Sequence, residues 1–77
     1  MIYYRAKIDF LCGQRPLIED ELLTEKEAIR YGAVNKELML LKPYSNFLQK
    51  IEANPKDTYT SFGVRKLTKQ YRYKVVK

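Results

Sequence analysis

Residues 2–11 alternate between apolar and polar side chains, and this pattern limits the possible folds more than any other feature of the 77-residue chain. A period of two predicts a β-strand with one face in the core and one in solvent. The inward face is expected to carry Ile2, Tyr4, Ala6, Ile8 and Phe10, and the outward face Tyr3, Arg5, Lys7 and Asp9.

The next segment has the length and composition of a β-hairpin. Residues 12–16 contain glycine and proline and are predicted to form the loop, after which Leu17-Ile18 returns antiparallel. The three acidic residues 19–21 favour a turn, and Leu22-Leu23 is expected to re-enter the core. Cys12 is the only cysteine, so the chain cannot form an internal disulfide; we expect a reducing cytoplasm and a thiol in the loop or at the edge of the core.

A capping box predicts one short helix over residues 25–31. The hydroxyl of Thr24 can accept a hydrogen bond from the backbone of Glu27, whose carboxylate can reach back to Thr24. Gly32 is a suitable left-handed terminator. The expected packing residues are Ala28, Ile29 and Tyr31.

Residues 34–48 leave two alternatives open. Asn35 could cap a short helix through Leu41, with Leu38 and Leu41 facing the core, or residues 38–41 could form an extended buried run. Pro43 ends either element. The apolar run 38–41 is either buried or offers a surface for a homodimer or another partner.

A second hairpin is predicted around Asn54-Pro55-Lys56-Asp57, which has the residues of a type I turn. Its first arm is residues 47–53, with a helix over 47–52 as the competing interpretation. The second arm is residues 58–62 and is rich in threonine and aromatic residues. We expect Phe62 and Val64 to point inward and Arg65 outward, with a bulge at Gly63.

The end of this hairpin resembles that of small uncharacterised proteins of phages and mobile elements of Gram-positive bacteria. Those proteins end in an aromatic run followed by Phe-Gly-Ala-Arg or Phe-Gly-Val-Arg, and here Phe62-Gly63-Val64-Arg65 follows Thr58-Tyr59. They also carry a Leu-Leu-Thr-Glu-Lys-Glu-Ala-like segment, which corresponds to residues 22–28. The resemblance covers about half of the chain and implies an origin in a mobile element. It implies no activity.

The composition argues against several classes of function. Without histidine there is no Ser-His-Asp or Cys-His site and no zinc site of the usual composition, and the scattered glycines form no phosphate loop. No apolar run approaches the roughly 20 residues of a membrane span. We therefore predict no cofactor, no metal and no enzymatic activity. The remaining enzymatic hypothesis uses the carboxylates of Asp9, Glu19, Asp20, Glu21 and Asp57, of which the three clustered acids 19–21 could hold a divalent ion.

The charge of the chain is strongly asymmetric. Residues 1–64 contain nine basic and nine acidic residues, whereas residues 65–77 contain six basic residues and no acid, so the whole net charge of +6 lies at the C-terminal end. A strand over residues 68–77 would place Arg72 and Lys74 on one face, about 7 Å apart by strand rise. This spacing suits successive phosphates of a nucleic acid. Tyr3 and Tyr59 are the aromatic residues expected to remain exposed for base stacking.

We therefore predict one α+β domain over residues 1–77, with a small curved, mostly antiparallel sheet of four or five strands, one short helix, and a basic C-terminal strand or tail over 65–77. An SH3-like or other barrel-like closure is one form of such a sheet. The predicted core is Ile2, Tyr4, Ala6, Ile8, Phe10, Ile18, Leu22, Ile29, Leu38, Leu41, Ile51, Phe62, Val64, Tyr73 and Val75.

The predicted function is that of a small non-enzymatic accessory protein in the host cytoplasm. It would bind the phosphates of DNA or RNA non-specifically through its basic end. The candidate contact residues are Arg65, Lys66, Lys69, Arg72 and Lys74. The alternative is a protein-interaction module that modulates a host or phage protein with an acidic surface, or that forms a homodimer through Leu38–Leu41.

Overall fold

The computed structural model describes residues 1–61, 63–68 and 72–76. The strands are β1 (Ile2–Ala6), β2 (Phe10–Cys12), β3 (Arg15–Leu17), β4 (Leu22–Thr24), β5 (Leu48–Ala53), β6 (Thr58–Ser61), β7 (Val64–Leu67) and β8 (Tyr73–Val75). The one described α-helix is α1 (Glu25–Arg30), and two 3-10 turns are η1 (Tyr44–Asn46) and η2 (Pro55–Asp57).

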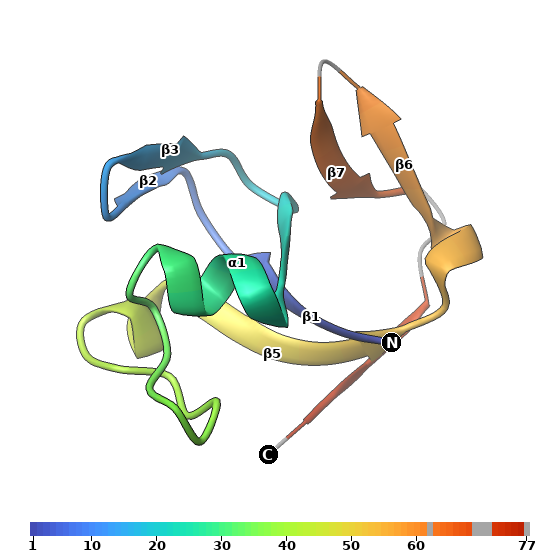
Figure 1. The fold of residues 1–77 in the computed structure, drawn as a ribbon. Helices are drawn as coiled ribbons and strands as arrows, with labels where there is room; N and C mark the ends of the chain where they lie inside the picture. Colours follow the sequence, from blue (N-terminus) through green and yellow to red (C-terminus); the bar gives the residue numbers. More distant parts are fainter. Residues whose placement is uncertain (62, 69–71, 77) are drawn as a thin grey trace.

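The main sheet is antiparallel and has the strand order β4-β1-β5-β8, so the first strand lies in its interior. The hairpins β2–β3 and β6–β7 extend from this sheet (Figure 1). A backbone bridge between Glu21 and Lys66 continues the edge of β4 into β7. The predicted α+β class with one short helix is confirmed, but the described strands do not close into a barrel.

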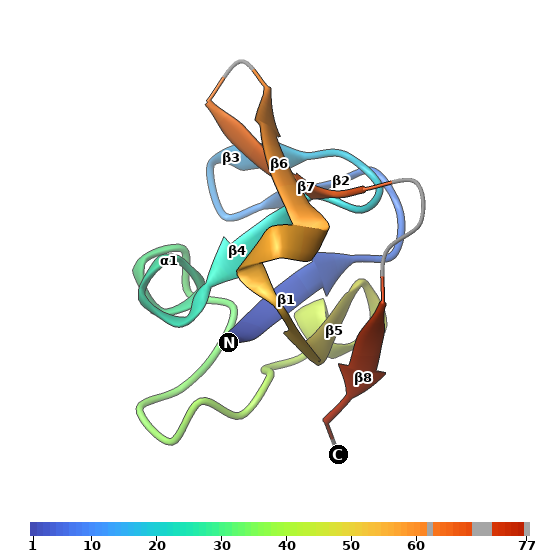
Figure 2. The same ribbon diagram turned by 90° about the vertical axis from the view of Figure 1, so that its right-hand side faces the viewer.

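Both faces of β1 are buried, and this was not predicted. On one face, Tyr4 and Ala6 pack with Ala28 of α1 and with Leu23. On the other face, Tyr3 is 2% exposed and packs with a cluster that Leu67 of β7 completes. Figure 2 shows the β6–β7 hairpin on the far side of the sheet from α1. The prediction that Tyr3 points to solvent is therefore wrong, because a second layer covers that face.

The first strand is shorter than the alternation predicts. The chain leaves the sheet after Ala6, whose N–H donates to the carbonyl of Glu21 at 2.9 Å and whose carbonyl accepts from Asp20 at 2.8 Å. It then bends and begins β2 at Phe10. Ile8 lies in the bend and is 49% exposed, so its predicted place in the core is wrong.

The β2–β3 hairpin is confirmed, but the predicted loop over residues 12–16 is wrong: the turn is Gly13-Gln14, and Cys12, Arg15 and Pro16 belong to the paired strands. Gly13 has φ of +61°, and a Cβ atom there would lie 2.9 Å from the carbonyl oxygen of Tyr31, so the turn needs glycine for two reasons. Cys12 is free and fully buried, and this burial raises the pKa of its thiol although Arg15 acts in the opposite direction. Ile18 follows the hairpin and is exposed, contrary to the prediction.

The helix forms as the capping box predicts. The hydroxyl of Thr24 accepts from the N–H of Glu27 at 3.2 Å, and the Glu27 carboxylate accepts from the N–H of Thr24 at 3.0 Å. The helix ends at Arg30, one residue earlier than predicted, and the left-handed Gly32 follows. Ala28 is buried, but Ile29 is 49% exposed and does not belong to the core.

Residues 34–47 adopt neither of the two alternatives. Asn35 caps no helix; its side-chain oxygen accepts from the N–H groups of Glu37 and Met39, and this folds the loop back on itself. Leu38 has a positive φ of 62° and is half-buried. Met39 is 64% and Leu41 39% exposed, so the predicted burial of Leu41 is wrong.

The second predicted hairpin is wrong in its pairing, although its turn chemistry is correct. The side chain of Asn54 accepts from the N–H of Lys56 at 3.0 Å, and the N–H of Asp57 donates to the carbonyl of Asn54 at 2.8 Å. However, β5 pairs with β1 and β8, whereas β6 pairs with β7. Gly63, with φ of +75°, therefore lies in a hairpin turn and not in a bulge.

The last described strand, β8, falls within the strand predicted over residues 68–77 and lies at the edge of the main sheet. Tyr73 is half-buried and packs against the cluster around Tyr3, whereas Val75 is 43% exposed and lies outside the core. Phe62 and its predicted inward orientation lie outside the described residues.

Burial on both faces makes a testable prediction for the adjacent residues Leu22 and Leu23. They point to opposite faces of β4, and both are at most 1% exposed. We expect Leu22→Ala and Leu23→Ala each to lower the free energy of unfolding by about 2–5 kcal/mol, measured by urea denaturation. Leu→Val at each position is the milder replacement if an alanine variant does not fold.

The matched control is Leu11→Ala, because Leu11 is 62% exposed. We expect this substitution to change the free energy of unfolding by no more than about 0.5 kcal/mol. If Leu23→Ala strongly lowered the free energy of unfolding and Leu22→Ala left it nearly unchanged, the two-sided core would be contradicted.

Candidate nucleic-acid interface

The structure divides the predicted basic residues between two elements. Arg65 and Lys66 belong to β7, Lys74 to β8, and Arg72 immediately precedes β8. Lys69 lies outside the described residues. The described basic residues therefore do not form one continuous strand, and their two groups have to be considered separately.

Arg65 points toward the body of the protein and not outward as predicted. Its guanidinium lies 5.6 Å from the centre of the Tyr3 ring, and its Nη1 atom is 3.7 Å from a carboxylate oxygen of Glu27. The side chain is 37% exposed. A phosphate at this position would have to compete with Glu27.

Lys66 occupies the opposite side of the hairpin. Its Cα partner on β6 is Tyr59, and its bridge partner on the β4 side is Glu21. The Glu21 carboxylate points to Arg15, with a distance of 2.6 Å between Arg15 Nη2 and Glu21 Oε2. Lys66 has no ion pair with any carboxylate in the part of the chain that the structure describes.

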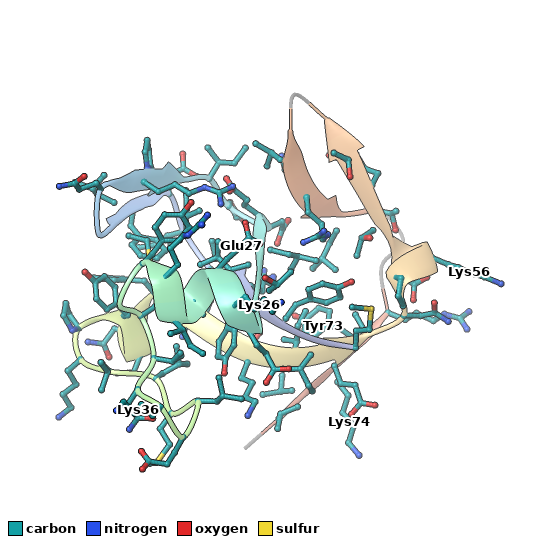
Figure 3. The ribbon with its side chains drawn as sticks, viewed as in Figure 1. Lys26, Glu27, Lys36, Lys56, Tyr73 and Lys74 are labelled. Carbon is teal, nitrogen blue, oxygen red and sulfur yellow. The ribbon has the colours of Figure 1, made fainter. Side chains whose placement is uncertain are left out.

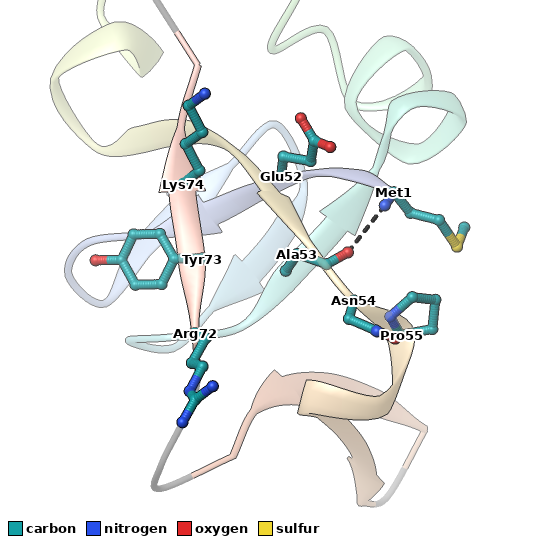
Figure 4. Close-up of a pocket in the computed structure, with 8 residues that line it drawn as sticks. All are labelled: Met1, Glu52, Ala53, Asn54, Pro55, Arg72, Tyr73 and Lys74. Atoms are coloured by element: carbon teal, nitrogen blue, oxygen red, sulfur yellow. Dashed lines mark hydrogen bonds between the residues drawn. The ribbon is translucent and has the colours of Figure 1, made fainter.

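Arg72 and Lys74 border an open hollow of about 560 Å³ at the edge of the sheet (Figure 4). Both are exposed, and neither has an ion pair with a described carboxylate. Glu52 is the Cα partner of Lys74 and reduces the positive potential there. The complete lining is Met1, Glu52, Ala53, Asn54, Pro55, Arg72, Tyr73 and Lys74.

A network of arginines and carboxylates inside the fold was missed by the sequence analysis. Arg15 binds both Glu21 and Glu27, at 2.6 and 3.0 Å, and lies over the Tyr31 ring. Arg5 binds Asp20 at 2.8 Å. These contacts connect β1, β3 and α1 to the turn before β4. Figure 3 shows Glu27 on α1 close to this turn and to the β2–β3 hairpin.

The network explains the acidic residues 19–21, which were predicted to form a turn and considered as a divalent-ion site. The turn is confirmed by the positive φ of 69° at Asp20. Asp20 and Glu21 are each held by an arginine. Within residues 1–61, 63–68 and 72–76, no group of acidic residues and cysteine is arranged to hold a metal ion.

Glu27 is the most connected carboxylate of the network. Burial acts to raise its pKa, but hydrogen bonds from Thr24 and Arg15, together with the charge of Arg15, outweigh burial and hold the pKa below the ordinary value of 4.5. The ionised form is therefore favoured in the folded protein. A small cavity of about 250 Å³ between Glu27, Arg15 and Arg65 borders this site.

Comparison of the chain with protein-family models, with curated proteins and with solved structures finds no match. The resemblance to phage and mobile-element proteins therefore stays a prediction. Among the described residues, no helix has the length and apolar character that crossing a membrane requires.

The lowered pKa of Glu27 predicts a pH-dependent stability. A folded-state pKa below the unfolded value stabilises the protein above about pH 4.5, and this contribution is lost as the pH falls through the folded-state pKa. In urea denaturation we expect Glu27→Gln to be less stable than the natural protein at pH 7. The difference should narrow as the pH falls below about 4.

Glu37→Gln is the control, because Glu37 is exposed and has no ion pair with a described basic residue. We expect this substitution to change the free energy of unfolding only slightly, and by the same amount at every pH. A stability difference for Glu27→Gln that stays constant between pH 7 and pH 3 would rule out the assigned role of the carboxylate.

Proposed function

We propose that this protein is a small non-enzymatic accessory protein of a phage or mobile element that binds the nucleic-acid backbone non-specifically. The contact residues are Lys66, Arg72 and Lys74. One observation supports this choice within the basic C-terminal end: Lys66, Arg72 and Lys74 have no ion pair with a described carboxylate, whereas Arg65 has one. Their charge is therefore available to a polyanion.

Three phosphate contacts would give weak, salt-dependent binding. Each contact contributes about −0.9 to the slope of log affinity against log salt on duplex DNA, and about −0.7 on a single strand. We therefore expect a slope of about −2 to −3. Between 1 M and 50 mM salt, one such contact corresponds to about a tenfold change in affinity.

The absence of a recognition element among the described residues favours non-specific binding. The described helix α1 has six residues, and Glu25 and Glu27 in its first turn already occupy the end of the helix dipole that would otherwise attract phosphates. Phosphate contacts position a protein on a nucleic acid but do not read its sequence.

A second candidate function is a protein-interaction module, and the loop 37–40 supports it. This loop and the residues Lys50 and Val76 border a hollow of about 380 Å³. Met39 is 64% exposed beside it. The exposed apolar residues would suit a second copy of the chain. The basic edge beside them would instead suit a partner with an acidic surface.

Nucleic-acid binding can be tested by charge reversal. We expect the double variant Arg72→Glu/Lys74→Glu to lose most of its affinity for DNA of arbitrary sequence at 50 mM salt. Its salt slope should fall in magnitude by about two, measured by fluorescence anisotropy. Glu52→Gln removes the acid that faces Lys74 and should strengthen binding.

Lys26→Glu/Lys36→Glu is the matched control. It makes the same change in net charge at two exposed lysines outside β7 and β8. If the two double variants lost the same amount of affinity for DNA, only the net charge would matter, and the assignment of the site would be overturned. If the natural protein binds no DNA or RNA at 50 mM salt but retains a protein from nuclease-treated host lysate, the interaction module becomes the better proposal.

A further inference from the structure

The β6–β7 hairpin presents one tyrosine and one lysine side by side on its outer side. Tyr59 and Lys66 are directly opposed across the two strands. The neighbouring pairs are Thr58 with Leu67 and Thr60 with Arg65. Successive side chains of a strand alternate between faces, so Tyr59 and Lys66 point away from the side that Leu67 and Arg65 occupy.

The inner side of the hairpin is occupied by contacts with the rest of the protein. Leu67 is 4% exposed in the core, and Arg65 lies over the Tyr3 ring. In contrast, Tyr59 is 44% exposed. Lys66, on the same side of the hairpin as Tyr59, is half-buried. Figures 1 and 2 both show the hairpin extending away from the main sheet.

An exposed ring beside an unpaired ammonium group matches the chemistry of single-stranded nucleic acid. Directly opposed side chains in an antiparallel pair have Cβ atoms about 4.5–5.5 Å apart. A stacked base and its own phosphate can therefore meet the ring and the ammonium group together. Base stacking on aromatic residues tolerates any sequence, because every base has a π-face.

We propose that Tyr59 stacks on an unpaired base while Lys66 contacts the adjacent phosphate, so that the protein prefers single strands to duplexes. This inference rests on the proposed function and specifies its ligand. Bases within a duplex are already stacked on their neighbours and leave no free face for Tyr59. Arg72 and Lys74 would contribute backbone contacts to both kinds of ligand.

The test compares a single-stranded 15-mer of deoxythymidine, a duplex of the same length and an oligomer of the same length without bases. Binding is measured by fluorescence anisotropy at 50 mM salt. Tyr59→Ala should weaken binding to the single strand by about fivefold or more. The affinity of the Tyr59→Ala variant for the duplex and for the base-free oligomer should differ from that of the natural protein by less than about twofold.

Two further variants separate stacking from loss of structure. Tyr59→Phe retains the ring and should bind the single strand as the natural protein does. Tyr59→Leu retains an apolar side chain without an aromatic face and should behave as Tyr59→Ala. Lys66→Ala should weaken binding to all three ligands.

The outcomes distinguish the two proposals. If Tyr59→Ala leaves single-strand binding unchanged, or weakens binding to all three ligands equally, the stacking proposal is overturned while backbone binding stands. If the natural protein binds none of the three ligands, both proposals are overturned. Thermal unfolding by circular dichroism establishes that each variant is folded.

Discussion

The structure depends on the burial of both faces of β1. A sheet of this size gains little from one covered face, because a small domain removes only a modest fraction of its surface from water. Here α1 covers Tyr4 and Ala6, and the β6–β7 hairpin brings Leu67 to the opposite face near Tyr3. The hairpin is therefore a second layer of the core as well as a projecting element. Because Leu67 faces the core, Tyr59 and Lys66 on the alternate face of the hairpin point away from the core.

The same arrangement determines which charges remain available. Arginine has several donors in a planar group and suits buried or half-buried ion pairs better than lysine does. Arg5, Arg15 and Arg65 accordingly hold carboxylates and lie over the aromatic rings of Tyr73, Tyr31 and Tyr3. The acidic and basic residues of the fold are thus partly neutralised inside it.

Local features of the fold could be predicted from the sequence, and features that depend on distant contacts could not. The capping box at Thr24, the hairpin after Phe10 and the turn at Asn54 each depend on a few adjacent residues, and each is present. The partners of β5 depend on which strands lie beside it in the folded protein, and these strands are distant in the sequence. Turn chemistry at Asn54 cannot supply that information, so the predicted pairing of residues 47–53 with 58–62 was wrong.

In the candidate site, too, local features could be predicted from the sequence and features that depend on distant contacts could not. The cluster of positive charge was visible in the sequence, but periodicity could not show that β7 and β8 belong to different sheets. Arg65 was expected to face solvent because neither Tyr3 nor Glu27 could be placed near it. The side-by-side arrangement of Tyr59 and Lys66 required the β6–β7 register, which the sequence assigned to another pair of strands.

The edge position of β8 has a consequence for the solution behaviour of the protein. Of the described strands, β8 pairs only with β5, and such an edge strand can recruit a strand from another molecule. Positive charge at Arg72 and Lys74 opposes this self-association through mutual repulsion. We therefore expect the two residues to reduce aggregation through this edge, and selection for solubility alone would be a reason to keep them.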